Sequence, residues 1–209
     1  MESSAKIQRF FASDKLLRGA VIVFCVLLAV NIAAKAVLGL YTLCLSDLCF
    51  LLCVVFLYRA FRRHNKNVQK GLLGAVLMWY FCDEMSYVLS NIVFDPEAFS
   101  RYDNFAGKGY LLLSIITLVL YIPLFINHFS LSGDHKSKPA GVKAELWLGI
   151  VLSLVSLVSI VFQCPVVYPS AGGIVESVTW HTALVAFLTV VGSYEAHMEQ
   201  WKEQREVAE

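Results

Sequence analysis

The sequence predicts an all-α, polytopic membrane protein in which six transmembrane helices form one bundle. Of its 209 residues, 58% are hydrophobic and only 16% are charged, whereas soluble domains average about 45–50% apolar and 25% charged residues. Six apolar segments follow one another, and each has roughly the ~20 residues that a helix needs to cross the hydrocarbon core. They are Gly19–Leu40, Tyr41–Phe61, Gly71–Phe94, Gly109–Leu131, Glu145–Tyr168 and Ile174–His197. They are too long for transmembrane β-strands, which have about 9–11 residues and alternate in polarity.

The distribution of Lys and Arg predicts that both termini are cytoplasmic. Fourteen of these residues lie in the N-terminal segment, the second and fourth linkers and the C-terminal tail, against two in the connections on the other side. Cytoplasmic loops of membrane proteins carry such an excess of basic residues. We therefore divide the chain into a basic cytoplasmic N-terminal segment (1–18), a six-helix transmembrane domain (19–197) and a charged helical cytoplasmic tail (198–209). The cytoplasmic or plasma membrane is the expected location.

The two ends of the chain carry further expectations. Ile7, Phe10 and Phe11 are spaced to lie along the membrane surface before Ser13 caps the first helix. Ala34–Ala36 resembles a signal-peptidase site, but the apolar run before it is long and another span follows directly, so we favour an uncleaved first span. The charged tail favours a helix, which offers a surface to a cytoplasmic partner.

The third apolar segment is unusual because it carries Asp83 and Glu84 side by side near its middle. At about 100° per helical residue, Tyr80, Tyr87 and Asn91 share one face with these carboxylates, and apolar residues cover the other face. A carboxylate in a transmembrane helix costs a few kcal/mol, so such residues face protein or water rather than lipid. The other helices are therefore expected to assemble around this polar face.

Two charged residues lie on the arms of the tight hairpin between the first and second apolar segments. Lys35 and Asp47 are at matching depths if the helices rise by ~1.5 Å per residue. We therefore predict an ion pair between them. A pair within one hairpin more often holds two helices in register than serves a function, so we interpret it as structural.

Most ionisable residues of the predicted spans lie in the outer half of the membrane. Glu176 begins the last span, and His181 follows one to two turns deeper, near the depth of Glu84. A structural ion pair has no preferred depth, so this asymmetry favours a polar cavity open to the outside, in which Asp83, Glu84 and His181 share one site. The predicted ligand-binding residues are Asp83, Glu84, Tyr80, Tyr87, Asn91, Glu176 and His181.

Three functions are open at this stage. A domain that binds or senses a small molecule or a lipid ranks first, because it fits the predicted cavity. A small transporter, coupled to protons through Asp83, Glu84 and His181, ranks second because the sequence shows no inverted repeat. A membrane-embedded hydrolase that uses the carboxylates and His181 ranks third, because HExxH, GxSxG and paired metal-ligand spacings are missing from the sequence.

The cysteines and charges limit the expected cofactors and partners. All six cysteines lie in or beside apolar segments, which favours packing as small apolar residues over a disulfide framework. Cys49 and Cys53 are one helical turn apart, but no second soft pair at matching depth completes a metal site. We expect no metal, no cofactor and no nucleic-acid partner, whereas membrane lipids are expected partners.

Overall fold

The computed structural model describes Ile7 and residues 9–63, 66–89, 105–132, 139–163 and 170–206, and in these residues it contains helices and no strands. The long helices are α2 (Asp14–Val37), α3 (Tyr41–Arg62), α4 (Lys66–Leu89), α6 (Phe105–Ser132), α7 (Pro139–Gln163) and α8 (Ala171–Glu206). Each predicted apolar segment lies mostly within one of them. The predicted all-α bundle is therefore confirmed.

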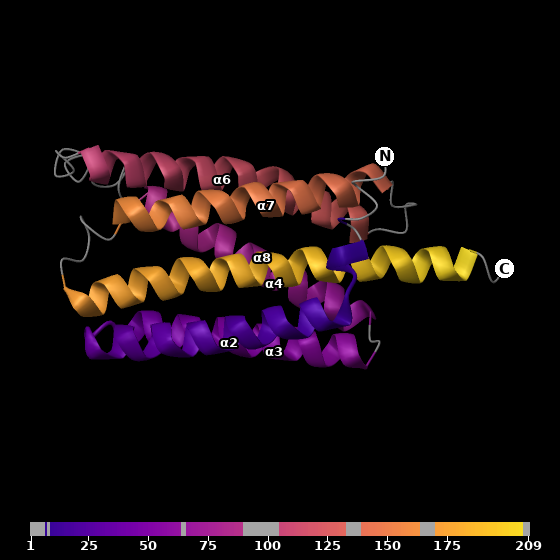
Figure 1. Ribbon diagram of the computed structural model, residues 1–209, viewed down its shortest axis with the longest axis horizontal. Coiled ribbons are helices and arrows are strands. Elements are labelled where there is room, and N and C mark those ends of the chain that lie inside the picture. The colour runs from indigo at the N-terminus through magenta and orange to yellow at the C-terminus, as the bar shows by residue number, and fades with distance from the viewer. Residues whose placement is uncertain are drawn as a thin grey trace.

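The helices lie side by side and alternate in direction along the chain (Figure 1), and their contacts follow a closed ring. Each long helix packs against the next one along the chain, and α8 closes the ring by packing against α2. We call the end at which α2 turns into α3 the hairpin end, and the end at which α2 begins the terminal end. With 36 residues, α8 is the longest of these helices and extends past the others at the terminal end.

The tight turn between α2 and α3 requires a glycine. Gly39 has a φ angle of 77°, in the left-handed region that residues with a Cβ rarely adopt. The Leu40 amide donates to the Lys35 carbonyl at 2.9 Å, and the Gly39 amide donates to Ala36 at 3.1 Å. These bonds close the end of α2 and fix the position of Lys35 next to the start of α3.

Aromatic rings fill the space between α2, α3, α4 and α8. Phe50 packs edge-on against Phe24 and Phe187, with ring centroids 5.1 Å apart in both pairs, and it stacks on Trp79 at 4.6 Å. Lipid tails are as apolar as these rings, so close packing rather than removal from water drives the association. Such ring pairs contribute about 0.5–1.5 kcal/mol each.

The outside of the bundle carries large apolar side chains on several helices. A soluble monomer rarely exposes large apolar patches, whereas apolar side chains of this kind suit contact with lipid tails. Examples with more than 40% of their surface exposed are Ile22, Val26, Leu45, Leu52, Phe56, Leu112, Val119, Ile126, Leu154 and Val161.

Four helical stretches are long and apolar enough to cross a membrane by length and composition, namely Asp14–Val37, Tyr41–Arg62, Lys108–Ile126 and Ala171–His197. In α4 and α7 the apolar stretches found among the described residues are shorter, Gly71–Asp83 and Leu146–Phe162. The chain therefore has the helices of a membrane protein. The six-span count and the cytoplasmic termini stay predictions.

Five of the six long helices, all except α3, begin earlier than hydropathy predicts. α2 starts at Asp14 instead of Gly19, because its polar first turn is helical although it is too polar for the hydrocarbon core. Ser13 occupies the N-cap position, as predicted, but its side chain makes no capping hydrogen bond. α4 likewise begins at Lys66 instead of Gly71.

Candidate functional site

Four polar side chains from α2, α3 and α8 meet at the hairpin end of the bundle. Lys35 Nζ lies 2.7 Å from Asp47 Oδ2 and 3.6 Å from Glu176 Oε1. Asn31 lies one turn from Lys35 on α2, and none of the four residues is more than 6% exposed. One ammonium group thus faces two buried carboxylates. We call Asn31, Lys35, Asp47 and Glu176 the charged cluster.

Further contacts fasten α8 to α2 around this cluster. The Asn31 amide donates to the Glu176 carbonyl oxygen at 2.7 Å and to Thr179 Oγ1 at 3.1 Å. Lys35 Nζ lies 4.5 Å from the centroid of the Trp180 ring, whose negative face attracts a cation. The structure therefore places the predicted Lys35–Asp47 pair in contact with Glu176, which the sequence analysis assigned to the ligand site.

Two oxygens of the charged cluster have no hydrogen-bond donor. They are Oε2 of Glu176 and Oδ1 of Asn31, and both are buried. A buried acceptor without a donor costs about 1–3 kcal/mol, and such groups are few in native structures. With two carboxylates and one ammonium ion, the cluster also lacks one positive charge when both carboxylates are ionised.

The polar face of α4 is described only in part. Asp83 is exposed at the surface of the bundle, and its carboxylate interacts electrostatically with Lys35 and Asp47. The side chains of Glu84 and Tyr87 and the whole of Asn91 lie outside the described residues.

His181 and Tyr80 lie in other parts of the core. His181 Nδ1 is 3.1 Å from the hydroxyl oxygen of Ser156 on α7, and the Tyr80 ring lies 4.6 Å from that of Tyr121 on α6. Five residues on a helix correspond to about 140° of rotation, so Glu176 and His181 face different neighbours of α8. The structure brings Glu176 to α2 and α3, whereas it brings His181 to α7.

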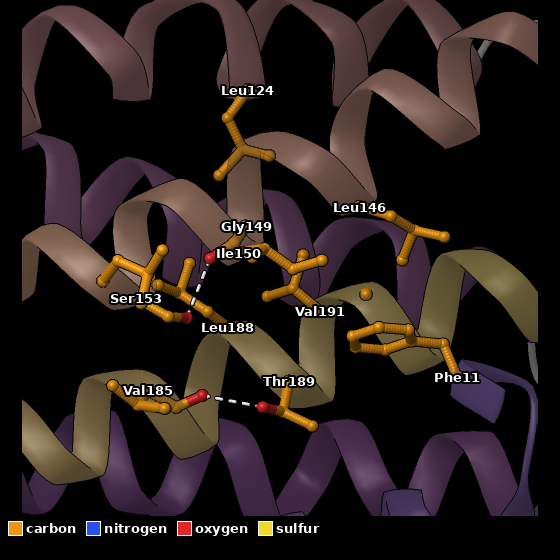
Figure 2. A pocket seen from close by; sticks show the side chains of 12 residues that line it. Phe11, Leu124, Leu146, Gly149, Ile150, Ser153, Val185, Leu188, Thr189 and Val191 are labelled. Carbon is orange, nitrogen blue, oxygen red and sulfur yellow. Dashed lines mark hydrogen bonds between the residues drawn. The ribbon is translucent and has the colours of Figure 1, made fainter. Parts of the chain in front are cut away.

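A cavity of about 220 Å³ lies nearer the terminal end, between α6, α7 and α8 (Figure 2). Its two hydroxyl groups turn back to their own helices, with Ser153 donating to the Gly149 carbonyl at 2.8 Å and Thr189 to the Val185 carbonyl at 2.9 Å. The lining therefore presents mostly apolar atoms. We call this space the apolar cavity. Its lining residues are Phe11, Leu124, Leu146, Gly149, Ile150, Ser153, Leu154, Val185, Leu188, Thr189, Val191 and Gly192.

Phe11 borders the apolar cavity from outside the six helices. Figure 2 shows its ring directed toward the cavity from the side of the N-terminal segment. A Cβ atom at Gly192 would lie 3.2 Å from this ring and 3.0 Å from Leu146, so the glycine permits the close approach. The expectation that Phe11 lies on the membrane surface is therefore wrong, because a glycine on α8 gives the ring a place in the bundle.

Hydrogen bonds hold the N-terminal segment against the second half of α8. The Ser193 hydroxyl donates to the Phe11 carbonyl oxygen at 2.6 Å. His197 places Nδ1 2.7 Å from the Ser193 carbonyl oxygen and Nε2 3.0 Å from Asp14 Oδ1. The start of the chain is thus connected to the apolar cavity.

A second, more open hollow of about 490 Å³ lies between α3 and α4 at the terminal end. Arg59 and Arg63 line it together with apolar side chains such as Phe56 and Leu72. As for metals, no group of three or more His, Cys, Asp or Glu residues that could hold an ion occurs in the described part of the chain.

The sequence analysis did not anticipate the apolar cavity. Its signal in the sequence is a set of small residues, Gly149 and Ser153 on α7 and Gly192 on α8, where larger side chains would fill the space. These residues are separated by about forty positions along the chain, and small residues also occur at ordinary helix contacts. Only the packing of the helices shows that they border one space.

Comparison with known proteins gives this chain no relative: no family model, no curated protein and no solved structure matches it.

Proposed function

We propose that this membrane protein binds the acyl chain of a lipid in the apolar cavity between α6, α7 and α8. The cavity itself carries the proposal, because its volume is about 220 Å³ and its hydroxyl groups are already hydrogen-bonded. Apolar cavities of about 150 Å³ accept a guest of the size of benzene, whereas pockets for drug-sized ligands measure about 300–1,000 Å³. The volume therefore suits part of an acyl chain.

The N-terminal segment connects ligand binding in the apolar cavity to the ends of the protein. Phe11 borders the cavity and its carbonyl oxygen accepts a hydrogen bond from Ser193. A guest that moves Phe11 also strains that bond and shifts the segment against α8. Since the sequence predicts both chain ends in the cytoplasm, such a shift connects a lipid in the membrane to a cytoplasmic partner of the tail. The proposed role is thus a lipid sensor.

A second candidate, a proton-coupled transporter, is supported by the charged cluster. A transporter needs buried groups that change their charge, and Glu176 has an oxygen without a hydrogen-bond donor beside Lys35. In this alternative, the polar ligand site predicted from the sequence would extend from Glu176 and Asp83 to Glu84 and Asn91.

Photolabelling tests the acyl-chain proposal. The purified protein is reconstituted with a phosphatidylcholine that carries a diazirine at the end of one acyl chain, and labelled residues are mapped by mass spectrometry. We expect label on Leu124 and Leu188, which are buried, in addition to Val161, which is 71% exposed and reports ordinary lipid contact. Gly149→Phe is expected to reduce the labelling of Leu188 at least several-fold and leave Val161 unchanged.

The matched control is Gly19→Phe. A Cβ at Gly149 has the Leu188 carbonyl oxygen at 4.0 Å as its nearest contact, whereas a Cβ at Gly19 meets nothing within 4 Å. Both variants add the same side chain, but only the first adds it at the cavity. Equal labelling of Leu188 in the two variants would contradict the proposal, as would labelling confined to exposed residues in the unaltered protein.

A further inference from the structure

The charged cluster lies at the hairpin end, away from the apolar cavity, and its charges are unbalanced. Lys35 and Asp47 form the short contact at 2.7 Å, and Glu176 reaches the same ammonium group only at 3.6 Å. Glu176 is 6% exposed and its Oε2 has no donor. An ionised carboxylate in low dielectric is expensive unless a cation or hydrogen bonds compensate it. Lys35 offsets the negative charge of Glu176 at Oε1, and no cation lies as close to Oε2 in the described residues.

The surroundings of Glu176 also contain an acceptor that lacks a donor. Asn31 has no exposed surface, and its Nδ2 is already used for the Glu176 carbonyl oxygen and Thr179. Its Oδ1 has no donor among the described residues. A hydrogen on Glu176 Oε2 removes the excess negative charge of the cluster and turns a buried acceptor without a donor into a hydroxyl group that can donate.

We propose that Glu176 is a reversible proton-binding site, in which a proton is taken up on Oε2 while Lys35 stays paired with Asp47. In this step an O–H bond forms on the carboxylate, no other bond breaks, and the cluster changes from one net negative charge to neutral. This site is independent of lipid binding in the apolar cavity.

Protonation changes the position of Lys35. With Glu176 ionised, the ammonium group is attracted by two carboxylates from α3 and α8, and with Glu176 neutral it is attracted mainly by Asp47. Asp83 of α4 is a further charged group near the cluster, because it interacts with Lys35 and Asp47. On α8, the nearest titratable side chain along the helix is His181, which bonds Ser156 of α7.

Trp180 provides a reporter for this movement, because its ring centroid lies 4.5 Å from Lys35 Nζ. The test uses the full chain with Trp79→Phe, Trp147→Phe and Trp201→Phe, which leaves Trp180 as its single tryptophan. Its fluorescence is recorded in detergent at constant ionic strength over the pH range in which the protein stays folded. We expect a one-proton transition that disappears in Glu176→Gln and persists in Asp83→Asn. An unchanged transition in Glu176→Gln, or no transition in the parent protein, overturns the proposal.

A second measurement needs no substitution. Infrared difference spectra of the unaltered protein between acid and alkaline pH are expected to show the carbonyl stretch of a buried protonated carboxyl group. Labelling with ¹³C-glutamate should shift this band, which identifies a glutamic acid rather than Asp47 or Asp83. A band that does not move with the label assigns the proton to an aspartate and also overturns the proposal.

Discussion

Lys35 lies closer to Asp47 than to Glu176. This difference in distance determines how the stability of the cluster responds to substitution. Removing one partner of a buried ion pair typically costs about 3–5 kcal/mol, because the other charge is left uncompensated. Lys35→Met leaves Asp47 and Glu176 without their cation, whereas Asp47→Asn leaves Lys35 with Glu176 at 3.6 Å.

We therefore expect Lys35→Met to lower the free energy of unfolding by about 3–5 kcal/mol and Asp47→Asn to lower it by clearly less. The double variant Lys35→Met with Asp47→Asn should lose less than the sum of the single variants. Thermal unfolding in detergent measures this cycle, with Lys15→Met, an exposed lysine on the same helix, as the control. Additive losses, or equal losses for the two single variants, would show that Lys35 does not link both carboxylates.

At this scale the sequence allowed part of the cluster to be predicted. The depth argument placed Lys35 beside Asp47 because they flank one short turn, where few geometries are open to the chain. Glu176 joins them from a helix more than a hundred residues later in the chain. The sequence indicated the depth of Glu176 in the membrane, but not the side of the helix on which it lies. The sequence analysis assigned His181 to one site with Asp83 and Glu84. Because the rotation of α8 about its axis was not evident from the sequence, the hydrogen bond between His181 and α7 was not predicted.

The contact between α8 and the N-terminal segment could not be predicted from sequence patterns. Residues Val190–His197 of α8 are all buried, so this part of the helix has no exposed face, and periodicity cannot show which side meets which neighbour. The apolar segments themselves were evident from length and composition. The packing of Phe11 on Gly192 depends on a missing side chain and has no periodic signal.

The attachment of the N-terminal segment can be weakened without changing the six helices. Ser193→Ala removes the donor to the Phe11 carbonyl oxygen, and Gly192→Ala places a methyl group against the Phe11 ring. Because each change acts on the segment, we expect at least several-fold faster hydrogen exchange in residues 9–13 and little change within α3. Gly149→Ala, which adds the same methyl group where nothing lies closer than 4.0 Å, is the matched control. Equal exchange in Gly192→Ala and Gly149→Ala would contradict the role of the glycine.

The whole molecule is distinguished by an apolar exterior that surrounds a partly charged interior. This arrangement explains why composition and hydropathy predicted the membrane class and the helical bundle. The number of spans is harder to predict, because α4 and α7 carry polar residues near their ends and have shorter apolar stretches within the described part of the chain, Gly71–Asp83 and Leu146–Phe162. Neighbouring helices can shield such polar positions from lipid, so hydropathy alone underestimates helices packed within a bundle.

Six spans and four spans place the connection between α4 and α6 on opposite sides of the membrane. If only α2, α3, α6 and α8 cross, a chain that starts in the cytoplasm returns there after α3, and Asp103 stays cytoplasmic. If α4 and α7 also cross, Asp103 is outside. Both arrangements keep Ser170 outside and Arg63 inside. Asp103 is therefore the deciding position, with Ser170 and Arg63 as the two reference positions.

Single cysteines are introduced at these three positions in a variant without native cysteines, and cells are treated with a membrane-impermeant maleimide. We expect Asp103→Cys and Ser170→Cys to react in intact cells, and Arg63→Cys to react only after permeabilisation. Ser170 and Arg63 are both exposed at helix ends, so a difference between them reflects the membrane rather than burial in the protein. Reaction of Asp103→Cys only after permeabilisation, with the reference positions behaving as expected, would establish four spans. Reaction of Arg63→Cys in intact cells would reverse the predicted orientation, because the basic residues would then lie outside, against their usual distribution.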